Sequence, residues 1–152
     1  MDASNVYGSD DDSSAALRAL DGTGKLLVTT VGDNDMLPVD ADTTEEFAGD
    51  VRAREMPGLA AMHTLFVREH NRICELIAAV TPGEDEEYYF ENARRIVGAE
   101  MQNIVYSEYL PVVLGEDAME DGGLGMYQSA KREGANRINI SYVFTCFFSH
   151  YH

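Results

Sequence analysis

Three side chains of contrasting chemistry lie close together in the sequence: Arg52, Glu55 and Met56. Residues three and four apart share one side of a helical turn, so a helix here would bring a guanidinium, a carboxylate and a thioether together. The same spacing suits an ordinary surface ion pair of Arg52 with Glu55, with Met56 as a flexible filler of the core. Spacing alone therefore leaves both interpretations open.

A long amphipathic helix directly after these residues must position them. Pro57 suits a first helical turn. The apolar residues that follow recur at helical spacing, which predicts one buried stripe: Leu59, Met62, Phe66, Ile73, Ile77 and Val80. His70 falls on the same stripe. We expect His63 and His70 to be hydrogen-bonded core residues, because histidines on an apolar helix face usually are.

A second long helix is predicted after the break at residues 81–83, Thr-Pro-Gly. Acidic residues 84–87 suit its start, and we expect it to run to about Tyr109, before Pro111 ends it. Its apolar stripe predicts packing against the first helix: Phe90, Ala93, Val97, Met101 and Ile104. Glu91 and Arg95 are spaced for a supporting ion pair. Gln102 and Tyr106 are interpreted as structural.

The remaining segments are less regular. Residues 10–14 can cap a short helix over Ser14–Leu20, and residues 22–46 read as a long, poorly ordered loop. Residues 116–134 form another expected loop, and the apolar residues from Ile140 to Tyr151 predict a last helix that ends at His152. Cys74 and Cys146 form no CxxC pair, which favours buried free thiols.

The composition limits the class of protein. A chain of 152 residues has room for one domain, and 27 acidic against 11 basic side chains give a formal charge of −16. So acidic a surface argues against nucleic-acid and anionic-membrane partners, although some carboxylates could bind a cation. No apolar run approaches the roughly 20 residues that span a bilayer, and the sequence has no signal-type segment.

Residues 48–72, AGDVRAREMPGLAAMHTLFVREHNR, closely resemble the signature segment of the animal haem peroxidases. Residues 93–115 resemble the next helix of that family, and residues 2–10, DASNVYGSD, resemble an earlier segment. The resemblance implies an all-α fold, mainly helical with long irregular loops. Because the catalytic domain of the family is several times longer, residues 1–152 are expected to be an interior piece. It would lack the segment with the distal histidine and the C-terminal helices.

The resemblance also implies roles in a haem site. Arg52 matches the arginine whose fixed charge stabilises the leaving oxygen of the peroxide. Glu55 matches the residue that forms an ester with a haem methyl group. Met56 matches the residue that forms a sulfonium bond with a haem vinyl group. His152 matches the proximal histidine, the ligand of the haem iron. Residues 149–151, Ser-His-Tyr, depart from the arginine, aromatic residue and glycine that precede this histidine in the family.

Calcium is the second cofactor that the resemblance implies, because Asp2 and Ser4 match family positions that supply calcium ligands, and carboxylate and carbonyl oxygens suit this cation. The remaining family ligands are expected from an upstream segment, so the site would be incomplete. The implied partners are hydrogen peroxide and small electron donors such as halides or phenols. Two alternatives stay open: a non-catalytic acidic helical or calcium-dependent interaction module, and a cyclooxygenase- or dioxygenase-like enzyme that acts on fatty acids. The pair Glu55 and Met56 argues against the second alternative.

Overall fold

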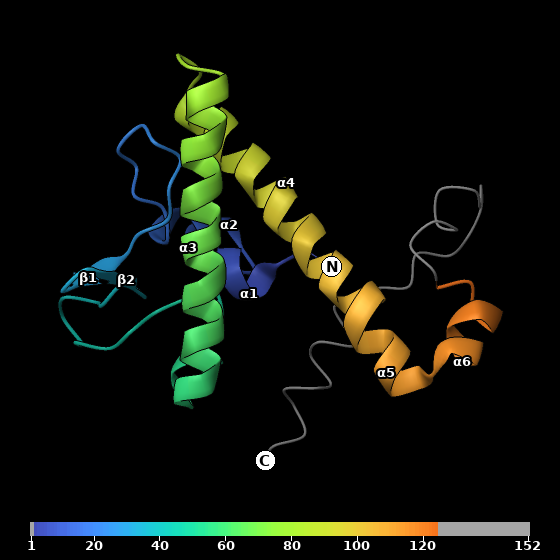
Figure 1. Cartoon of the computed structure of the whole chain (residues 1–152). Coiled ribbons are helices and arrows are strands. Elements are labelled where there is room, and N and C mark those ends of the chain that lie inside the picture. Colours follow the sequence, from blue (N-terminus) through green and yellow to red (C-terminus); the bar gives the residue numbers. More distant parts are fainter. Residues whose placement is uncertain (1, 125–152) are drawn as a thin grey trace. The chain divides into compact units, whose positions relative to one another are not determined.

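The structure is a computed structural model that describes residues 2–124 (Figure 1). The chain divides into two compact units. The first unit is Ala3–Val97. The second combines Met1–Asp2 with Gly98–His152, of which residues 2 and 98–124 are described. The predicted last helix, residues 140–151, lies outside the described residues.

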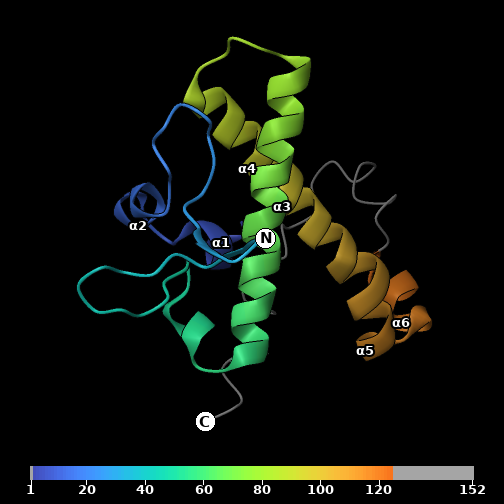
Figure 2. The ribbon, with the colours of Figure 1, turned by 60° about the vertical axis from the view of Figure 1, so that its left-hand side comes forward.

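Helices α1 (Ser4–Tyr7) and α2 (Asp11–Ala16) open the first unit, and a hairpin of β1 (Thr29–Val31) and β2 (Asn34–Met36) follows. A 3-10 turn (Val51–Arg54) then leads into α3 (Pro57–Val80), which a short turn joins to α4 (Glu86–Ile104). Figure 2 shows α1 and the loops of residues 17–50 lying along one side of α3. Helix α3 is therefore the element against which α1, β2 and the 3-10 turn pack.

The buried face of α3 differs from the predicted apolar stripe. Ile73 is buried as predicted, but Met62 is 51% exposed and Val80 is 80% exposed. The buried residues include three polar ones: His63, Thr64, Val67, His70, Ile73 and Cys74. The prediction was wrong at Met62 and Val80 because apolar periodicity does not show which neighbouring segment covers a helix. Polar groups can be buried here because they form hydrogen bonds.

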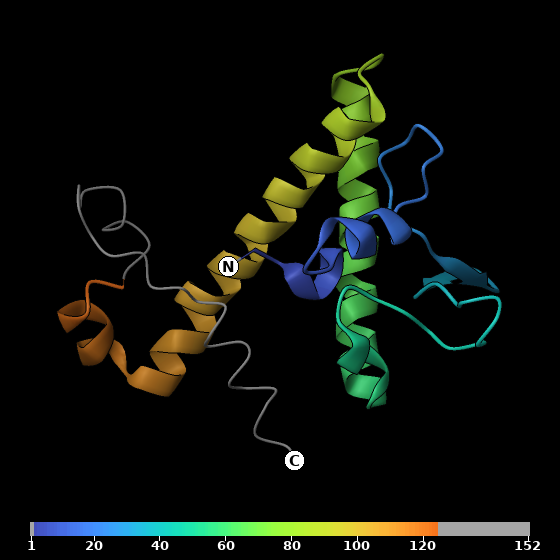
Figure 3. The ribbon, with the colours of Figure 1, turned by 180° about the vertical axis from the view of Figure 1, so that it is seen from behind.

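Helices α3 and α4 meet near the turn that joins them. The Phe90 ring lies edge-on to His70, with ring centroids 5.2 Å apart, and the Cys74 thiol lies 3.9 Å from the Tyr89 carbonyl oxygen. Figure 3 shows the first part of α4 separating from α3 with distance from the turn. The predicted packing is thus confirmed close to the turn. Tyr7 of α1 covers another side of Phe90, with ring centroids 5.8 Å apart.

Residues 17–47 have defined structure, so the expectation of a poorly ordered loop was wrong. Strands β1 and β2 pair antiparallel, and isolated bridges join Arg18 to Leu26 and Val39 to Glu46. Asn71 of α3 bonds both backbone groups of Leu26, at 2.8 and 3.0 Å. The loop is ordered because a helix side chain satisfies its backbone groups, which loop composition alone does not reveal.

Helix α2 begins earlier than predicted. It covers Asp11–Ala16 rather than 14–20, because Asp10 itself is the N-cap and accepts a hydrogen bond of 2.8 Å from the Ser13 amide. In α4, Glu91 pairs with Arg94 at 3.5 Å rather than with Arg95. Both corrections shift a local feature without changing the order of the elements.

The second unit contains the end of α4, a π-helical turn (Val105–Tyr109), α5 (Leu110–Leu114) and α6 (Glu116–Asp121). Pro111 does not end the helical path as predicted. It lies in the first turn of α5, where its missing N–H is tolerated. The wider π turn also changes the helical phase. Ile104, which the predicted apolar stripe placed on the buried face, is 42% exposed, while Val105 packs in a cluster with Leu110 and Met119.

Among residues 2–124, no helix is both long enough and apolar enough to cross a membrane.

Candidate functional site

The signature residues lie on the 3-10 turn and at the start of α3. Side chains three residues apart eclipse on a 3-10 turn, so Arg52 and Glu55 share one side, and Glu55 contributes electrostatically to the raised pKa of Arg52. Met56 leaves the helical conformation, with φ −150° and ψ 146°, and acts as the N-cap of α3 before Pro57. The expected single helical turn therefore holds for Arg52 and Glu55 but not for Met56.

The Arg52 guanidinium is held by the carboxylate of Asp50. Arg52 Nε donates to Asp50 Oδ1 at 3.0 Å and Oδ2 at 3.2 Å, and Nη2 donates to Oδ2 at 2.6 Å. These hydrogen bonds raise the pKa of Arg52 and hold the pKa of Asp50 below its ordinary value. Among the described residues, Arg52 Nη1 has no hydrogen-bond partner. Asp50 therefore binds the guanidinium edge formed by Nε and Nη2, and Nη1 can donate to another group.

The Asp50 side chain also accepts a hydrogen bond from the backbone of the turn. Asp50 is the N-cap of the 3-10 turn, where its Oδ1 accepts a 2.9 Å hydrogen bond from the Arg52 amide. The preceding Gly49 lies against α1 so closely that a Cβ atom would come within 2.5 Å of the Gly8 nitrogen and 2.6 Å of the Ser4 oxygen. Only glycine permits this approach. The segment that carries Asp50 is thus anchored on α1.

Glu55 and Met56 lie on the surface of this unit. Met56 is 58% exposed, Glu55 is exposed, and no side-chain hydrogen bond of Glu55 is recorded among residues 2–124. Val51, in the same turn, is 79% exposed. A carboxylate, a thioether, a half-buried guanidinium and exposed apolar surface suit the edge of a large, flat, mainly apolar cofactor. The chemistry of this set therefore fits a porphyrin.

His63 is buried near this site. Its Nδ1 lies 2.8 Å from the Leu59 carbonyl oxygen, which can only accept, so Nδ1 carries the hydrogen. Its Nε2 is buried without a hydrogen-bond partner among the described residues. Asp50, whose pKa is lowered mainly by its hydrogen bond with Arg52, lies within electrostatic reach of His63. His63 is a core residue as predicted, although one ring nitrogen lacks the expected partner.

His70 satisfies both ring nitrogens. The Gly24 carbonyl can only accept, so His70 Nε2 donates to it at 2.9 Å, and the Tyr7 hydroxyl donates to Nδ1 at 2.9 Å. Cys74 donates to the same carbonyl at 3.3 Å. Burial lowers the pKa of His70 to about 4 and raises the pKa of the Cys74 thiol to about 11. These groups are structural, as predicted for His70, and Cys74 is a buried free thiol as predicted.

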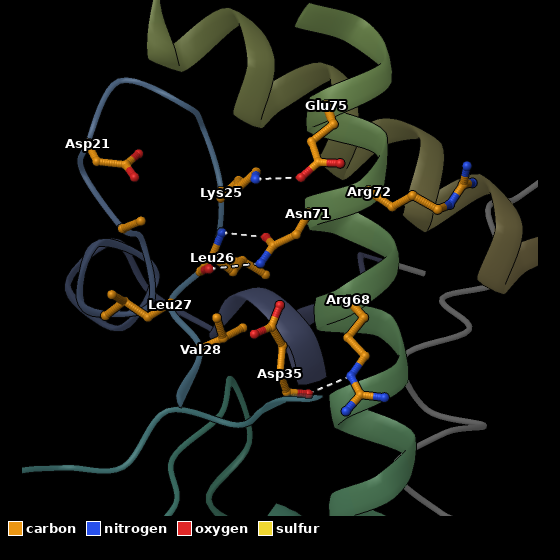
Figure 4. A pocket seen from close by; sticks show the side chains of 11 residues that line it. Asp21, Lys25, Leu26, Leu27, Val28, Asp35, Arg68, Asn71, Arg72 and Glu75 are labelled. Atoms are coloured by element: carbon orange, nitrogen blue, oxygen red, sulfur yellow. Dashed lines mark hydrogen bonds and ion pairs between the residues drawn. The ribbon is translucent and has the colours of Figure 1, made fainter. Parts of the chain in front are cut away.

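A surface hollow of about 420 Å³ lies between the N-terminal loop and α3 (Figure 4). Lys25 pairs with Glu75 at 2.7 Å along its wall, Asn71 bonds Leu26, and Arg68 donates to the Asp35 carbonyl. None of the predicted haem or calcium residues lines it. These contacts explain how the loop is held on α3.

Of the other predicted site residues, the structure describes Asp2 and Ser4 but not His152. His152 and Cys146 lie outside the described residues. Asp2 is exposed, and Ser4 is the first residue of α1. Residues 2–124 contain no cluster of three or more His, Cys, Asp and Glu side chains that could hold a metal ion. Asp50, which binds the Arg52 guanidinium, was not predicted from the sequence. Its signal was its place two residues before Arg52 within the resembling segment.

A mainly helical domain with a clamped arginine beside an exposed glutamate and methionine fits the class of haem-binding protein that residues 48–72 predict. The chain belongs to the animal haem peroxidase family, whose model matches residues 1–151. The prediction of the family from residues 48–72 is therefore confirmed.

Curated relatives agree with this assignment. The chain is 39% identical over 132 residues to chorion peroxidase of Aedes aegypti, 40% over 137 residues to mouse myeloperoxidase, and 37% over 145 residues to peroxidasin of Drosophila melanogaster. These alignments cover 82%, 79% and 84% of this chain but 17%, 19% and 9% of the relatives. The chain thus spans less than a fifth of the length of the relatives it matches.

Solved structures show the same helical fold. Peroxidase A from Dictyostelium discoideum matches with a TM-score of 0.65 and 31% identity, covering 72% of this chain and 24% of that one. A fatty acid alpha-dioxygenase from Arabidopsis thaliana matches with a TM-score of 0.68 and 26% identity, covering 80% and 18%. The fold prediction, mainly helical with long loops, is confirmed.

Proposed function

We propose that the whole protein is a haem peroxidase, which reduces hydrogen peroxide and oxidises halides or small organic donors. Membership of the animal haem peroxidase family supports this proposal. The observation that carries it is the Arg52 guanidinium, which Asp50 holds by Nε and Nη2 while Nη1 has no recorded partner in the described chain. A half-buried, fixed positive charge with a free donor suits a reaction that develops negative charge on oxygen.

Haem, when bound, supplies the redox chemistry that breaks the oxygen–oxygen bond of the peroxide. Arg52 contributes the fixed charge and an N–H donor for the oxygen that becomes negative. Arginine suits this role because its guanidinium keeps its charge at any ordinary pH, so no proton has to move to or from it. The charge is in place before peroxide arrives, and little reorganisation is needed during the reaction.

Glu55 and Met56 are proposed to hold the haem edge, Glu55 through an ester and Met56 through a sulfonium bond. Each bond would replace a C–H bond of the cofactor, and hydrogen peroxide, reduced to water, would be the two-electron oxidant. Their exposure in this unit supports the proposal, because a nucleophilic carboxylate oxygen and a thioether sulfur must both reach the cofactor. His152 is proposed as the iron ligand on the strength of its sequence position alone. If haem is bound, Glu55, Met56 and His152 would together hold the ring relative to Arg52.

Calcium is proposed as a second cofactor. Asp2 and Ser4 offer oxygen atoms of the type that Ca²⁺ prefers, but this cation takes six to eight ligands. Most ligands must therefore come from water or from other residues. If the proposal is right, calcium raises the melting temperature of the whole protein, and Asp2→Asn reduces that increase. An equal increase in both proteins would refute the role of Asp2.

The peroxidase proposal is tested with the purified whole protein reconstituted with haem. A Soret band and peroxide-dependent oxidation of guaiacol are expected, and both should require the cofactor. Arg52→Gln should keep the Soret band and lose most of the oxidation rate. A protein that binds haem but oxidises no halide, phenol or aromatic amine with peroxide would overturn the proposal.

A fatty-acid oxygenase is the second candidate, because the fatty acid alpha-dioxygenase structure matches with a TM-score as high as that of the Dictyostelium peroxidase. The two candidates differ in their oxidant. Oxygen consumption with a long-chain fatty acid, in the absence of peroxide, would favour this candidate. Peroxide-dependent guaiacol oxidation without fatty-acid-dependent oxygen uptake would exclude it.

A further inference from the structure

We propose that Asp50 is the positioning residue for Arg52: it binds one edge of the guanidinium and leaves Nη1 as the donor that faces peroxide. The proposal rests on the proposed function, in which Arg52 stabilises the negative oxygen. It adds a residue that does not touch peroxide or haem itself and acts through Arg52.

The contacts between the two side chains define the orientation of the guanidinium. Both carboxylate oxygens of Asp50 take part, with Oδ1 3.0 Å from Nε and Oδ2 2.6 Å from Nη2. Two parallel hydrogen bonds between a planar fork and a planar carboxylate fix the plane of the guanidinium as well as its distance. A single bond would leave the group free to rotate. The pairing therefore determines where Nη1 points.

The carboxylate of Asp50 is itself held in place. The Arg52 amide donates to Oδ1 at 2.9 Å, which ties the side chain to the first residues of the 3-10 turn. Gly49 packs on the backbone of α1 at distances that exclude a side chain. Asp50 is also largely shielded from solvent, with a side chain that is 23% exposed. A rigid carboxylate can orient an arginine, whereas a mobile surface carboxylate cannot.

Asp50 also removes a competing ion pair. Glu55 lies on the same side of the turn as Arg52 and contributes to its raised pKa. We infer that, without Asp50, Glu55 would attract the guanidinium, because the two side chains share one side of the turn. Rotation toward Glu55 would displace Nη1 and occupy a carboxylate that is proposed to bond to haem. Asp50 therefore keeps both residues in their separate roles.

The first test is a double-mutant cycle on the haem-loaded whole protein. Asp50→Asn keeps an acceptor for the Arg52 amide but loses the charge and one acceptor. Asp50→Ser keeps a good N-cap and cannot reach the guanidinium. Both should slow the stopped-flow reaction with peroxide by roughly 10- to 100-fold, with an unchanged haem content, because small displacements of an oriented group are costly. In an Arg52→Gln background the same changes should have little further effect.

Glu45→Gln is the matched control. Glu45 pairs with Arg54, the neighbouring arginine of the same turn, and neither residue belongs to the proposed haem set. This variant should leave the peroxide reaction unchanged. If Asp50→Asn and Asp50→Ser both react as fast as the wild type, or slow the reaction equally with and without Arg52, Asp50 is not a positioning residue.

The second test does not depend on activity. Labelling by phenylglyoxal, followed by peptide mass spectrometry, measures how accessible each guanidinium is. Asp50→Asn should raise the labelling rate of Arg52 several-fold and leave Arg54 unchanged, while Glu45→Gln should do the reverse. Unchanged labelling of Arg52 in both Asp50 variants would overturn the proposal. If the Asp50 variants change the labelling of Arg52 but Arg52→Gln does not slow the peroxide reaction, Asp50 positions Arg52 and the proposed function fails.

Discussion

His63 and His70 both lie on the buried face of α3, but their ring nitrogens have different surroundings. His70 bonds through both nitrogens, to Tyr7 and to the Gly24 carbonyl, whereas His63 bonds through Nδ1 to its own helix. A buried imidazole with two satisfied nitrogens is stable when neutral and costly to protonate. The hydrogen bonds of His70 therefore join α3 to two distant segments, whereas the hydrogen bond of His63 stays within α3.

The neutral state of His70 predicts a pH dependence of stability. Burial lowers the pKa of His70 from 6.5 to about 4. The unfolded chain therefore binds more protons between these values, so this contribution to stability is complete above pH 6.5 and is lost as the pH falls toward 4. At pH 5 this residue alone should cost about 2 kcal/mol relative to pH 7.

Urea denaturation at both pH values, compared between the wild type and His70→Gln, measures this contribution. Glutamine can accept from Tyr7 and donate to Gly24 but does not titrate. The variant should lose correspondingly less stability on acidification. An equal loss in both proteins would show that His70 titrates normally.

Arg52 offers a prediction on catalytic rate. Arg52→Gln should slow the reaction with peroxide by about 10²- to 10³-fold, the usual effect of removing one donor to a developing oxyanion. Arg52→Lys should recover part of the rate, because it restores the charge but not the two-pronged pairing with Asp50. Stopped-flow spectroscopy provides the rate constants. Arg54→Gln serves as the control, and a similar loss in that variant would mean that net charge, not position, matters.

At the scale of elements, α3 organises the first unit through side chains that reach the backbone of distant loops. Asn71 bonds both backbone groups of Leu26, and His70 and Cys74 bond the carbonyl of Gly24. Gly24 has φ +72°, and a Cβ there would lie 2.7 Å from the Phe90 nitrogen. The loop therefore passes through a narrow space between α3 and α4, where both conformation and size require glycine.

Loss of the Asn71 contacts should release this loop. Leu26 is 3% exposed, so Asn71→Ala leaves a buried N–H and a buried carbonyl without partners, which should cost about 1–3 kcal/mol. Asn92→Ala is the matched control, because Asn92 bonds a carbonyl of its own helix at an exposed position. It should change stability by less than about 0.5 kcal/mol. Urea denaturation measures the free energy of unfolding of both variants. An equal loss of stability in both would show that the hydrogen bonds between Asn71 and Leu26 do not hold the loop.

At the scale of the molecule, the described residues form two units, and the second unit has an apolar cluster of its own. The second unit is centred on Val105, Leu110 and Met119, with Tyr106, Tyr109 and Leu124 packed around them. The first unit contains the 3-10 turn and α3, and thus the proposed contacts to haem except His152. Substitutions in the apolar cluster of the second unit should therefore change the stability of that unit and leave α3 unaffected.

Leu110→Ala tests this separation. The lost side chain should loosen the second cluster, as large-to-small core changes do, and raise hydrogen exchange over residues 105–124. Exchange in the middle of α3 should stay unchanged. Val112→Ala, at a position that is 85% exposed, should alter neither region. Faster exchange throughout α3 in Leu110→Ala would indicate that the two units unfold together.

The amino-acid sequence determined the long helices, the break between them and the family, because helix periodicity, capping and the segment around Arg52 are encoded by residues close together in the chain. The tertiary structure decided which face of α3 is buried, the order of residues 17–47 and the path through Pro111. It also revealed Asp50 as the partner of Arg52. Tyr7 and His70 lie 63 residues apart in sequence and 2.9 Å apart in space. Only folding brings such groups together, because a buried polar atom takes whichever partner packing brings within reach.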